Sequence, residues 1–162
     1  MNDIDAELIN KKNKPFKISD FSDYQLYQIR RGLEEGIDVS KYADPKYNDF
    51  QMYEIRCGLE KGLDVSIYAD LKYNNNQMYM IRVGLEEGID VTAYADPKFD
   101  SYQMYEIRKG LKEGLDVSKY ADPKYNDDQM EQILLGLEEE CDKNFDHNTN
   151  NLSSEDEEED ER

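Results

Sequence analysis

The sequence has no tryptophan, one histidine, two cysteines and four prolines in 162 residues. It also lacks any apolar run of about 18 residues, the length that a membrane-spanning helix needs. Met1 to Lys12 lacks the basic and apolar regions of a secretory signal. Cys57 and Cys141 fall at different positions of different copies of the repeat described below, so we expect free thiols. These absences favour a cytoplasmic protein with no membrane partner.

Catalytic and metal-binding patterns are missing as well. His147, the only histidine, follows the last repeat, and its neighbours Asp146 and Asn148 are flexible polar residues. No cysteine–histidine cluster has the spacing of a metal site, and no glycine-rich loop resembles a phosphate cradle. An enzyme needs one unique constellation, whereas this chain repeats the same residues. We therefore expect a protein that is not an enzyme and that binds no metal or cofactor.

The net charge of −18 is concentrated at one end of the chain. Residues 129–162 contain thirteen acids against Lys143 and Arg162, a net charge of −11. The preceding repeats are only mildly acidic. A block of like charges such as Glu155 to Glu161 is usually solvated and disordered. The sequence therefore predicts a disordered acidic tail over residues 143–162.

The dominant feature of the sequence is a repeat of 26 residues. It is marked by a recurring glutamine, at Gln25, Gln51, Gln77, Gln103 and Gln129. The fullest copy, QMYEIRKGLKEGLDVSKYADPKYN, has close counterparts at the first three glutamines and a degenerate one, QMEQILLGLEEECDKNFDH, at the last. A fixed period of about 20 to 50 residues is typical of solenoids. The predicted fold is an all-α solenoid of about five units.

Each copy contains signals that start and end a helix. A residue that caps helix N-termini well stands three positions before each glutamine, at Ser22, Asn48, Asn74, Asp100 and Asn126. The glutamine then completes a capping box, and pairs such as Tyr47 and Met52 form a hydrophobic staple. Gly36 and its counterparts suit the left-handed helix end, and Pro45 ends the segment that follows. The predicted unit is a helix of three to four turns, a glycine turn, a stubby second helix and an extended link, without a strand.

A second glycine, Gly32 in the first copy, lies inside the predicted helix of every copy. In a helix interior, glycine is about 1 kcal/mol less favourable than alanine. We expect these glycines to allow close approach, so that the short second helix or the neighbouring unit packs against bare backbone.

These signals divide the chain into three parts. Residues 1–20 are predicted to form an N-terminal cap or arm, with a short helix over residues 3–12. The repeat domain spans residues 21–142, in units 21–46, 47–72, 73–98, 99–124 and 125–142. The acidic tail follows at 143–162. The last unit has Glu140 in place of the stopping glycine, and Glu131 and Leu134 in place of a tyrosine and an arginine, so it is predicted as the C-terminal cap.

A column of arginines, each three residues after a tyrosine, consists of Arg30, Arg56, Arg82 and Arg108. Stacking tyrosines and periodic arginines would suit a single nucleic-acid strand. However, a glutamate follows each of the first three arginines by one helical turn, and a net acidic body repels phosphate. We expect a ladder of Arg–Glu and Arg–Tyr contacts that joins neighbouring units, and no direct binding of nucleic acid.

The copies differ most on the helix face opposite Leu26, Ile29 and Leu33. This face is polar in the first copy and becomes apolar in the second and third. In the second copy, Ile67 and Leu71 also replace the Lys41 and Pro45 of the first copy. Exposed apolar clusters rimmed by charge often mark partner sites. Neutral drift at solvent positions is an equal alternative. The predicted partner-binding residues are Phe50, Cys57, Ile67, Met80 and Val83.

The string Q-M-x-x-I-R-x-G-L-E-x-G-[LI]-D-V-[ST]-x-Y-A-D-P resembles a tandem repeat in proteins of phages and conjugative elements of low-GC Gram-positive bacteria. The resemblance covers residues 21 to about 142. It implies a non-catalytic module. A small acidic protein of that origin implies an inhibitor of a host defence enzyme, of the anti-CRISPR or anti-restriction type, acting in the host cytoplasm.

The leading hypothesis is therefore a non-catalytic, protein-binding helical-repeat protein. Its partner would be a protein, for instance a basic enzyme that acts on nucleic acid. Two alternatives stay open: an acidic mimic of nucleic acid that occupies a basic groove, and a purely structural repeat scaffold. Self-association of the units also stays open.

Overall fold

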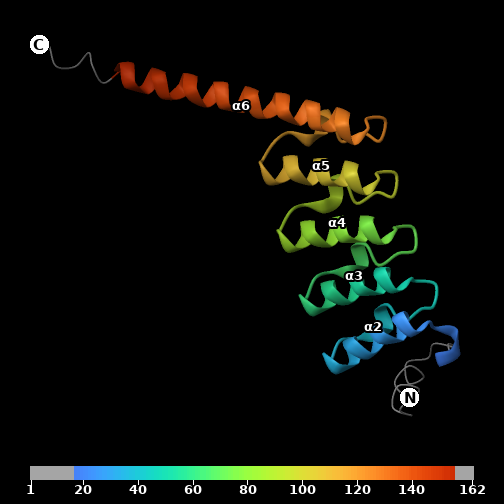
Figure 1. Ribbon diagram of the computed structural model, residues 1–162. Helices are drawn as coiled ribbons and strands as arrows, with labels where there is room; N and C mark the ends of the chain where they lie inside the picture. The colour runs from blue at the N-terminus through green and yellow to red at the C-terminus, as the bar shows by residue number, and fades with distance from the viewer. Residues whose placement is uncertain (1–16, 156–162) are drawn as a thin grey trace, which may run out of the picture.

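The computed structural model describes the backbone of residues 17–155 and the side chains of residues 17–143. The described chain is a stack of α-helices, each preceded by a short 3-10 turn (Figure 1). The α-helices are α2 (Asp23–Glu34), α3 (Asp49–Glu60), α4 (Asn75–Glu86), α5 (Ser101–Lys112) and α6 (Asp127–Glu155). The 3-10 turns are η1 (Ile18–Asp20), η2 (Val39–Lys41), η3 (Val65–Ile67), η4 (Val91–Ala93) and η5 (Val117–Lys119). Residues 17–155 contain no strand, which confirms the predicted all-α repeat fold.

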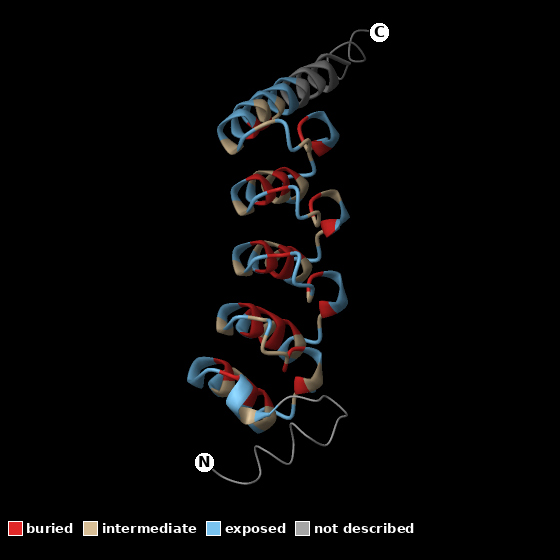
Figure 2. Cartoon of the chain, turned by 90° about the vertical axis from the view of Figure 1, so that its right-hand side faces the viewer, coloured by how far each residue is buried: buried red, intermediate tan, exposed pale blue. Residues whose placement is uncertain are grey.

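The stack has two layers. Figure 2 shows the α-helices in one layer and the 3-10 turns in the other, with buried residues between them. Each α-helix packs against the next along the stack. Met52, Met78 and Met104 of the predicted staples are fully buried, as are Ile55 and Ile81. One continuous core therefore runs the length of the array, because each unit buries its apolar face against its neighbour.

The predicted helix starts and ends are confirmed. Ser22 Oγ accepts a hydrogen bond from the Gln25 N–H at 3.2 Å, and Gln25 Oε1 accepts one from the Ser22 N–H at 2.7 Å. The same capping box occurs in the other four copies. Gly36 adopts a φ of 71°, and its counterparts are alike, so the chain turns there in the left-handed region that favours glycine. The stubby second helix is a single 3-10 turn.

Gly32 is needed for close approach, as expected, and the approaching group is a tyrosine of the same unit. Tyr42 follows η2, is fully buried, and its hydroxyl donates a hydrogen bond to the Gln28 carbonyl at 3.0 Å. A Cβ at Gly32 would lie 1.9 Å from that hydroxyl oxygen. The same arrangement recurs at Gly58, Gly84 and Gly110. The absence of a side chain at this glycine therefore lets the tyrosine pack the 3-10 turn against the helix of the same unit.

The C-terminal end differs from the expected boundary at residue 143. α6 runs without interruption to Glu155. The physical reason is the substitution at Glu140, which removes the glycine that ends the other helices. Residues 156–162 of the predicted tail lie outside the described residues, and so does the predicted N-terminal helix over residues 3–12.

Candidate interaction surface

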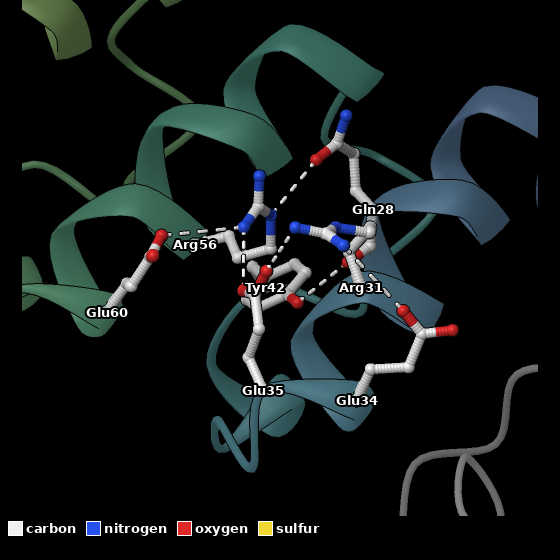
Figure 3. Close-up of polar contacts among 7 residues, drawn as sticks. All are labelled: Gln28, Arg31, Glu34, Glu35, Tyr42, Arg56 and Glu60. Carbon is white, nitrogen blue, oxygen red and sulfur yellow. Dashed lines mark hydrogen bonds and ion pairs between the residues drawn. The ribbon is translucent and has the colours of Figure 1, made fainter.

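A polar ladder connects neighbouring helices on one side of the core. We number the junctions between consecutive helices from the N-terminus, so that the first lies between α2 and α3. There, Arg56 Nε donates a hydrogen bond to Gln28 Oε1 at 3.2 Å, and Arg56 Nη1 pairs with Glu35 at 2.7 Å (Figure 3). The guanidinium also pairs with Glu60 at 3.6 Å and lies 5.5 Å from the centre of the Tyr53 ring. These contacts confirm the predicted Arg–Glu contacts between neighbouring units, but not the prediction that the Arg–Tyr contacts also join units. The Arg–Gln and Arg–Glu contacts include bonds between units, whereas the Arg–Tyr contact lies within one helix.

The second junction uses a buried ion pair. Arg82 Nε donates a hydrogen bond to Glu54 Oε2 at 2.7 Å, and Arg82 also pairs with Glu86. Glu54 is only 8% exposed, and burial raises the pKa of its carboxyl group although Arg82 opposes the shift. The helix face opposite Leu26, Ile29 and Leu33, which the sequence assigns to solvent, therefore includes a position that the structure buries or half-buries, that of Gln28, Glu54 and Met80. In a stack, a helix has neighbours on both flanks, so flanking positions are buried as well as those facing the core.

The third junction lacks one member of the ladder. Arg108 pairs with Glu87 and lies 5.5 Å from the Tyr105 ring centre, as its counterparts do. At the position of Gln28 and Glu54, however, this junction has Met80, which is half-buried and packs against the core. The Arg108 Nε atom is buried and has no hydrogen-bond partner. Leaving a buried donor unsatisfied costs about 1–3 kcal/mol. Met80 is therefore an energetically unfavourable substitution for the array itself.

The last junction lacks the opposite member. Leu134 stands where the other helices have the ladder arginine, and one carboxylate oxygen of Glu106 is buried without a hydrogen-bond partner. Burial raises the pKa of Glu106, and the neighbouring carboxylate of Glu131 adds to the shift. Leu134 itself is fully buried. Apolar packing of Leu134 thus replaces the ladder arginine, while Lys109 of α5 pairs with Glu138 of α6 at 3.3 Å.

Introducing a hydrogen-bond acceptor at Met80 measures how much stability the unpaired Arg108 Nε costs. Changing Met80→Glu is expected to stabilise the protein by about 1–2 kcal/mol, because the new carboxylate accepts from Arg108 Nε as Glu54 does from Arg82. The free energy of unfolding would be measured by urea denaturation. Met80→Leu serves as the control, since it keeps the position apolar and should change stability by less than about 1.5 kcal/mol. Equal or lower stability of Met80→Glu than of Met80→Leu would contradict the assignment.

The helices also carry an exposed aromatic surface, which we call the outer face. It comprises the exposed helix positions of Tyr24, Tyr27 and Arg31 and their counterparts, which share one side of a helix because they are three and four residues apart. Ten large hydrophobic side chains are exposed in the described residues, and two of them, Ile67 and Leu71, lie elsewhere. The eight on the outer face are Tyr24, Tyr27, Phe50, Tyr53, Tyr79, Tyr102, Tyr105 and Leu135.

Four of the five predicted partner-binding residues lie in α3 and α4. Phe50 is 63% exposed on the outer face, whereas Cys57 and Val83 are half-buried there. Met80 lies at the border between the outer face and the α4–α5 junction. Ile67 is exposed but belongs to η3, in the layer of 3-10 turns. The structure therefore groups the other four and separates Ile67 from them.

The regular tyrosine column is the part of this surface that the comparison of copies did not identify. Tyr27, Tyr53, Tyr79 and Tyr105 are each between 42% and 54% exposed. They are the same in every full copy, so a search for differences between copies passes over them. A hydrogen bond with the Cys57 side chain raises the pKa of Tyr53, so Cys57 contacts a member of the tyrosine column. The signal that identifies the column is its position three residues after Tyr24, on the same exposed side.

No protein-family model matches this sequence, and the searches of curated proteins and of solved structures found no match either. None of the helices in residues 17–155 is long and apolar enough to cross a membrane. Across the part of the chain that the structure describes, no three histidine, cysteine or acidic residues are grouped so that they could hold a metal ion. The likeness to repeats of phage and conjugative-element proteins therefore rests on the sequence motif, and the tandem helical repeat itself is evident in the structure.

Proposed function

We propose that this protein is a non-catalytic binding protein that holds a protein partner on its outer face. The observation that carries the proposal is the continuous row of exposed aromatic side chains across α2 to α5. Tyr53 and Tyr79 stand at its centre, beside the apolar side chains of Cys57 and Val83. Tyrosine and arginine are the residues most enriched at binding hot spots, and charged rims around apolar centres are usual at interfaces.

The energetics of Met80 support a selected surface over neutral drift. Drift is expected where a substitution changes no stabilising contact. Met80 replaces a ladder acceptor and leaves Arg108 Nε buried without a partner, which is unfavourable for folding. Residues that lower folding stability without a compensating contact are characteristic of functional positions. Met80 therefore belongs with Phe50, Cys57 and Val83 as a proposed contact of the partner.

The charge distribution favours this proposal over mimicry of nucleic acid along the array. Glu35, Glu54 and Glu86 are engaged by arginines of the ladder, and Glu87 by Arg108 and Lys112. Their charge is neutralised locally, so it is not presented to a basic groove. The narrower proposal, an inhibitor of a host defence enzyme, rests on the sequence resemblance alone.

The outer face can be tested against the layer of 3-10 turns with matched variants. The double variant Cys57→Glu/Val83→Glu places two carboxylates among the tyrosines of the outer face. The control, Ile67→Glu/Leu71→Glu, makes the same charge change at exposed apolar residues of the other layer. Proteins captured from host lysate by each bait would be quantified by mass spectrometry, after circular dichroism has confirmed equal helix content. We expect at least about a tenfold loss of the partner with the outer-face variant only, since charge at a desolvated contact costs more than about 1.4 kcal/mol. Equal capture by the wild type and the outer-face variant would contradict the proposal.

A further inference from the structure

In the first junction, the ladder arginine lies between carboxylates from both helices. Arg56 Nη1 pairs with Glu35 of α2 at 2.7 Å and with Glu60 of its own helix at 3.6 Å (Figure 3). Arg56 Nε also donates to the Gln28 side chain at 3.2 Å. Two carboxylates from neighbouring helices therefore lie within reach of one nitrogen atom, and the charge of the guanidinium compensates their repulsion.

The junction between α5 and α6 keeps the acceptor positions of this ladder but lacks the arginine. The acceptors are Glu106, Glu113 and Glu138, at the positions of Gln28, Glu35 and Glu60. Leu134 stands at the position of Arg56 and is fully buried. The second and third junctions both contain a guanidinium, from Arg82 and Arg108. Among the junctions of the described stack, the last one alone gathers three carboxylates around an apolar side chain.

The surroundings of two of these carboxyl groups show the effect of the missing arginine. One carboxylate oxygen of Glu106 is buried without a hydrogen-bond partner. The carboxyl groups of Glu113 and Glu138 contact each other, and a hydrogen bond between two carboxyl groups requires that one of them carries a proton. Burial and then this contact raise the pKa of Glu113, and burial and then the charge of Glu131 raise the pKa of Glu106. The last junction therefore takes up protons more readily than isolated glutamates do.

The charged groups that face Glu106 and Glu113 are one cation and three further acids. They are Lys109 on α5 and Asp127, Glu131 and Glu138 on α6. Lys109 Nζ pairs with Glu138 at 3.3 Å, and its charge opposes the raised pKa of Glu106 and Glu113 without cancelling it. From the 3-10 layer, Tyr120 donates its hydroxyl hydrogen bond to the Glu106 carbonyl, and burial raises its pKa, so it stays uncharged at neutral pH. The negative charge of this junction is therefore only partly compensated.

We propose that the junction between α5 and α6 responds to pH and holds α6 more tightly in mildly acidic than in neutral or alkaline solution. A proton on Glu113 can be donated to Glu138, and a proton on Glu106 removes a partly buried charge that no guanidinium compensates. α6 lies at the end of the stack, next to α5 (Figure 1). It can therefore separate from α5 while the other junctions stay closed, because each unit of a stack contacts only its neighbours. The proposal concerns the stack itself and does not depend on a partner at the outer face.

The direction of the pH dependence follows from the raised pKa values of the two carboxyl groups. When α6 separates from α5, both groups return to solvent and to the ordinary glutamate pKa of about 4.5. The closed junction thus binds more protons than the open one. Closure is strongest below about pH 4.5 and is weakened as the pH rises through the raised values. Burial raises the pKa of Glu54 in the second junction as well, so variants of the last junction are needed to assign the effect.

Hydrogen exchange of the α6 amides in the full chain tests the proposal. Exchange at about pH 5 and at about pH 7.5, corrected for the intrinsic effect of pH on exchange, gives the equilibrium constant for the opening of α6. For the wild type, we expect this constant to be at least about threefold larger at the higher pH. An opening constant that is equal at the two pH values, or larger at the lower one, overturns the proposal.

Neutral variants assign the effect to the carboxyl groups. Glu106→Gln/Glu113→Gln removes both charges and keeps the side-chain shape, so the opening of α6 should lose its pH dependence. The matched control is Glu35→Gln/Glu60→Gln, which makes the same charge change beside Arg56 in the first junction and should leave the pH dependence of α6 as in the wild type. A double variant of the last junction that keeps the wild-type dependence overturns the proposal. If that variant fails to fold, Glu113→Gln alone decides, since this side chain is exposed, and an undiminished pH dependence in it overturns the proposal as well.

Discussion

Gly58→Ala is expected to destabilise the protein by about 3 kcal/mol or more, a large fraction of the stability of a small protein. The added Cβ would lie 1.9 Å from the Tyr68 hydroxyl oxygen and 3.0 Å from Val65 Cγ1. Both neighbours belong to the buried core, so neither can move into solvent without opening it. The Tyr68 hydroxyl would also lose its hydrogen bond to the Glu54 carbonyl, at 3.1 Å. Overpacking and the loss of that bond together outweigh the better helix propensity of alanine.

Gly136→Ala is the matched control for this prediction. Gly136 occupies the same repeat position in α6, but a Cβ there meets nothing within 4 Å. The substitution should stabilise the protein by about 1 kcal/mol through helix propensity alone. The double variant Gly58→Ala/Tyr68→Phe should be less destabilised than the sum of its single variants, because the closest contact is removed. Urea denaturation followed by circular dichroism measures all four. Equal effects of alanine at Gly58 and Gly136 would show that the tyrosine contact does not determine stability.

Raising the pH above about 10 is expected to unfold the protein cooperatively. One fully buried tyrosine in each of the first four units donates a hydrogen bond from its hydroxyl to a helix carbonyl; these are Tyr42, Tyr68, Tyr94 and Tyr120. Burial raises the pKa of each hydroxyl above its ordinary value of about 10, while the unfolded chain keeps that value. The stability is therefore fully present below pH 10, and it is lost as the pH rises from there towards the folded pKa.

The expected slope is steep because four groups titrate together. Each buried tyrosine contributes up to about 1.4 kcal/mol of lost stability per pH unit above 10, so four contribute up to about 5–6 kcal/mol. Urea denaturation at successive pH values measures the slope. Tyr68→Phe should lower stability at neutral pH by about 1 kcal/mol, the worth of one hydrogen bond, but flatten the alkaline slope, because one of the titrating hydroxyls is removed. An unchanged slope in that variant would contradict this account.

The local elements could be predicted from the sequence because their bonds join residues close in the chain. The capping box between Ser22 and Gln25 joins residues three apart, and Gly36 supplies a left-handed turn that needs no distant partner. The stack followed from the period of 26 residues. The close approach at Gly32 was also predicted as such, but the partner was not, because Tyr42 reaches it only after the intervening turn has folded.

The candidate surface was predicted less well, and Met80 and Glu54 show why. If the face of Leu26, Ile29 and Leu33 is taken as the only buried face of the helix, the position that Met80 and Glu54 share is assigned to solvent. In the stack, that position faces the next helix, where Glu54 is buried against Arg82 and Met80 leaves Arg108 Nε without a partner. The Tyr53 column was predicted only as a partner of the ladder arginines and not as part of the exposed surface, since a feature identical in each full copy gives no difference to detect. Ile67 was grouped with residues of the opposite layer, because its distance from the helices is a property of the folded unit.

The sequence by itself determined the helices, their caps, the glycine turns and the repeated core, since these depend on hydrogen bonds and apolar spacing within one unit of 26 residues. Tertiary structure alone decided which polar side chains join neighbouring units and which aromatic residues remain exposed. The physical reason is that a helix in a stack is enclosed on three sides, by the 3-10 layer and two neighbouring helices. Burial at the flanks is set by residues 26 positions away, and the periodicity of one helix does not contain that information.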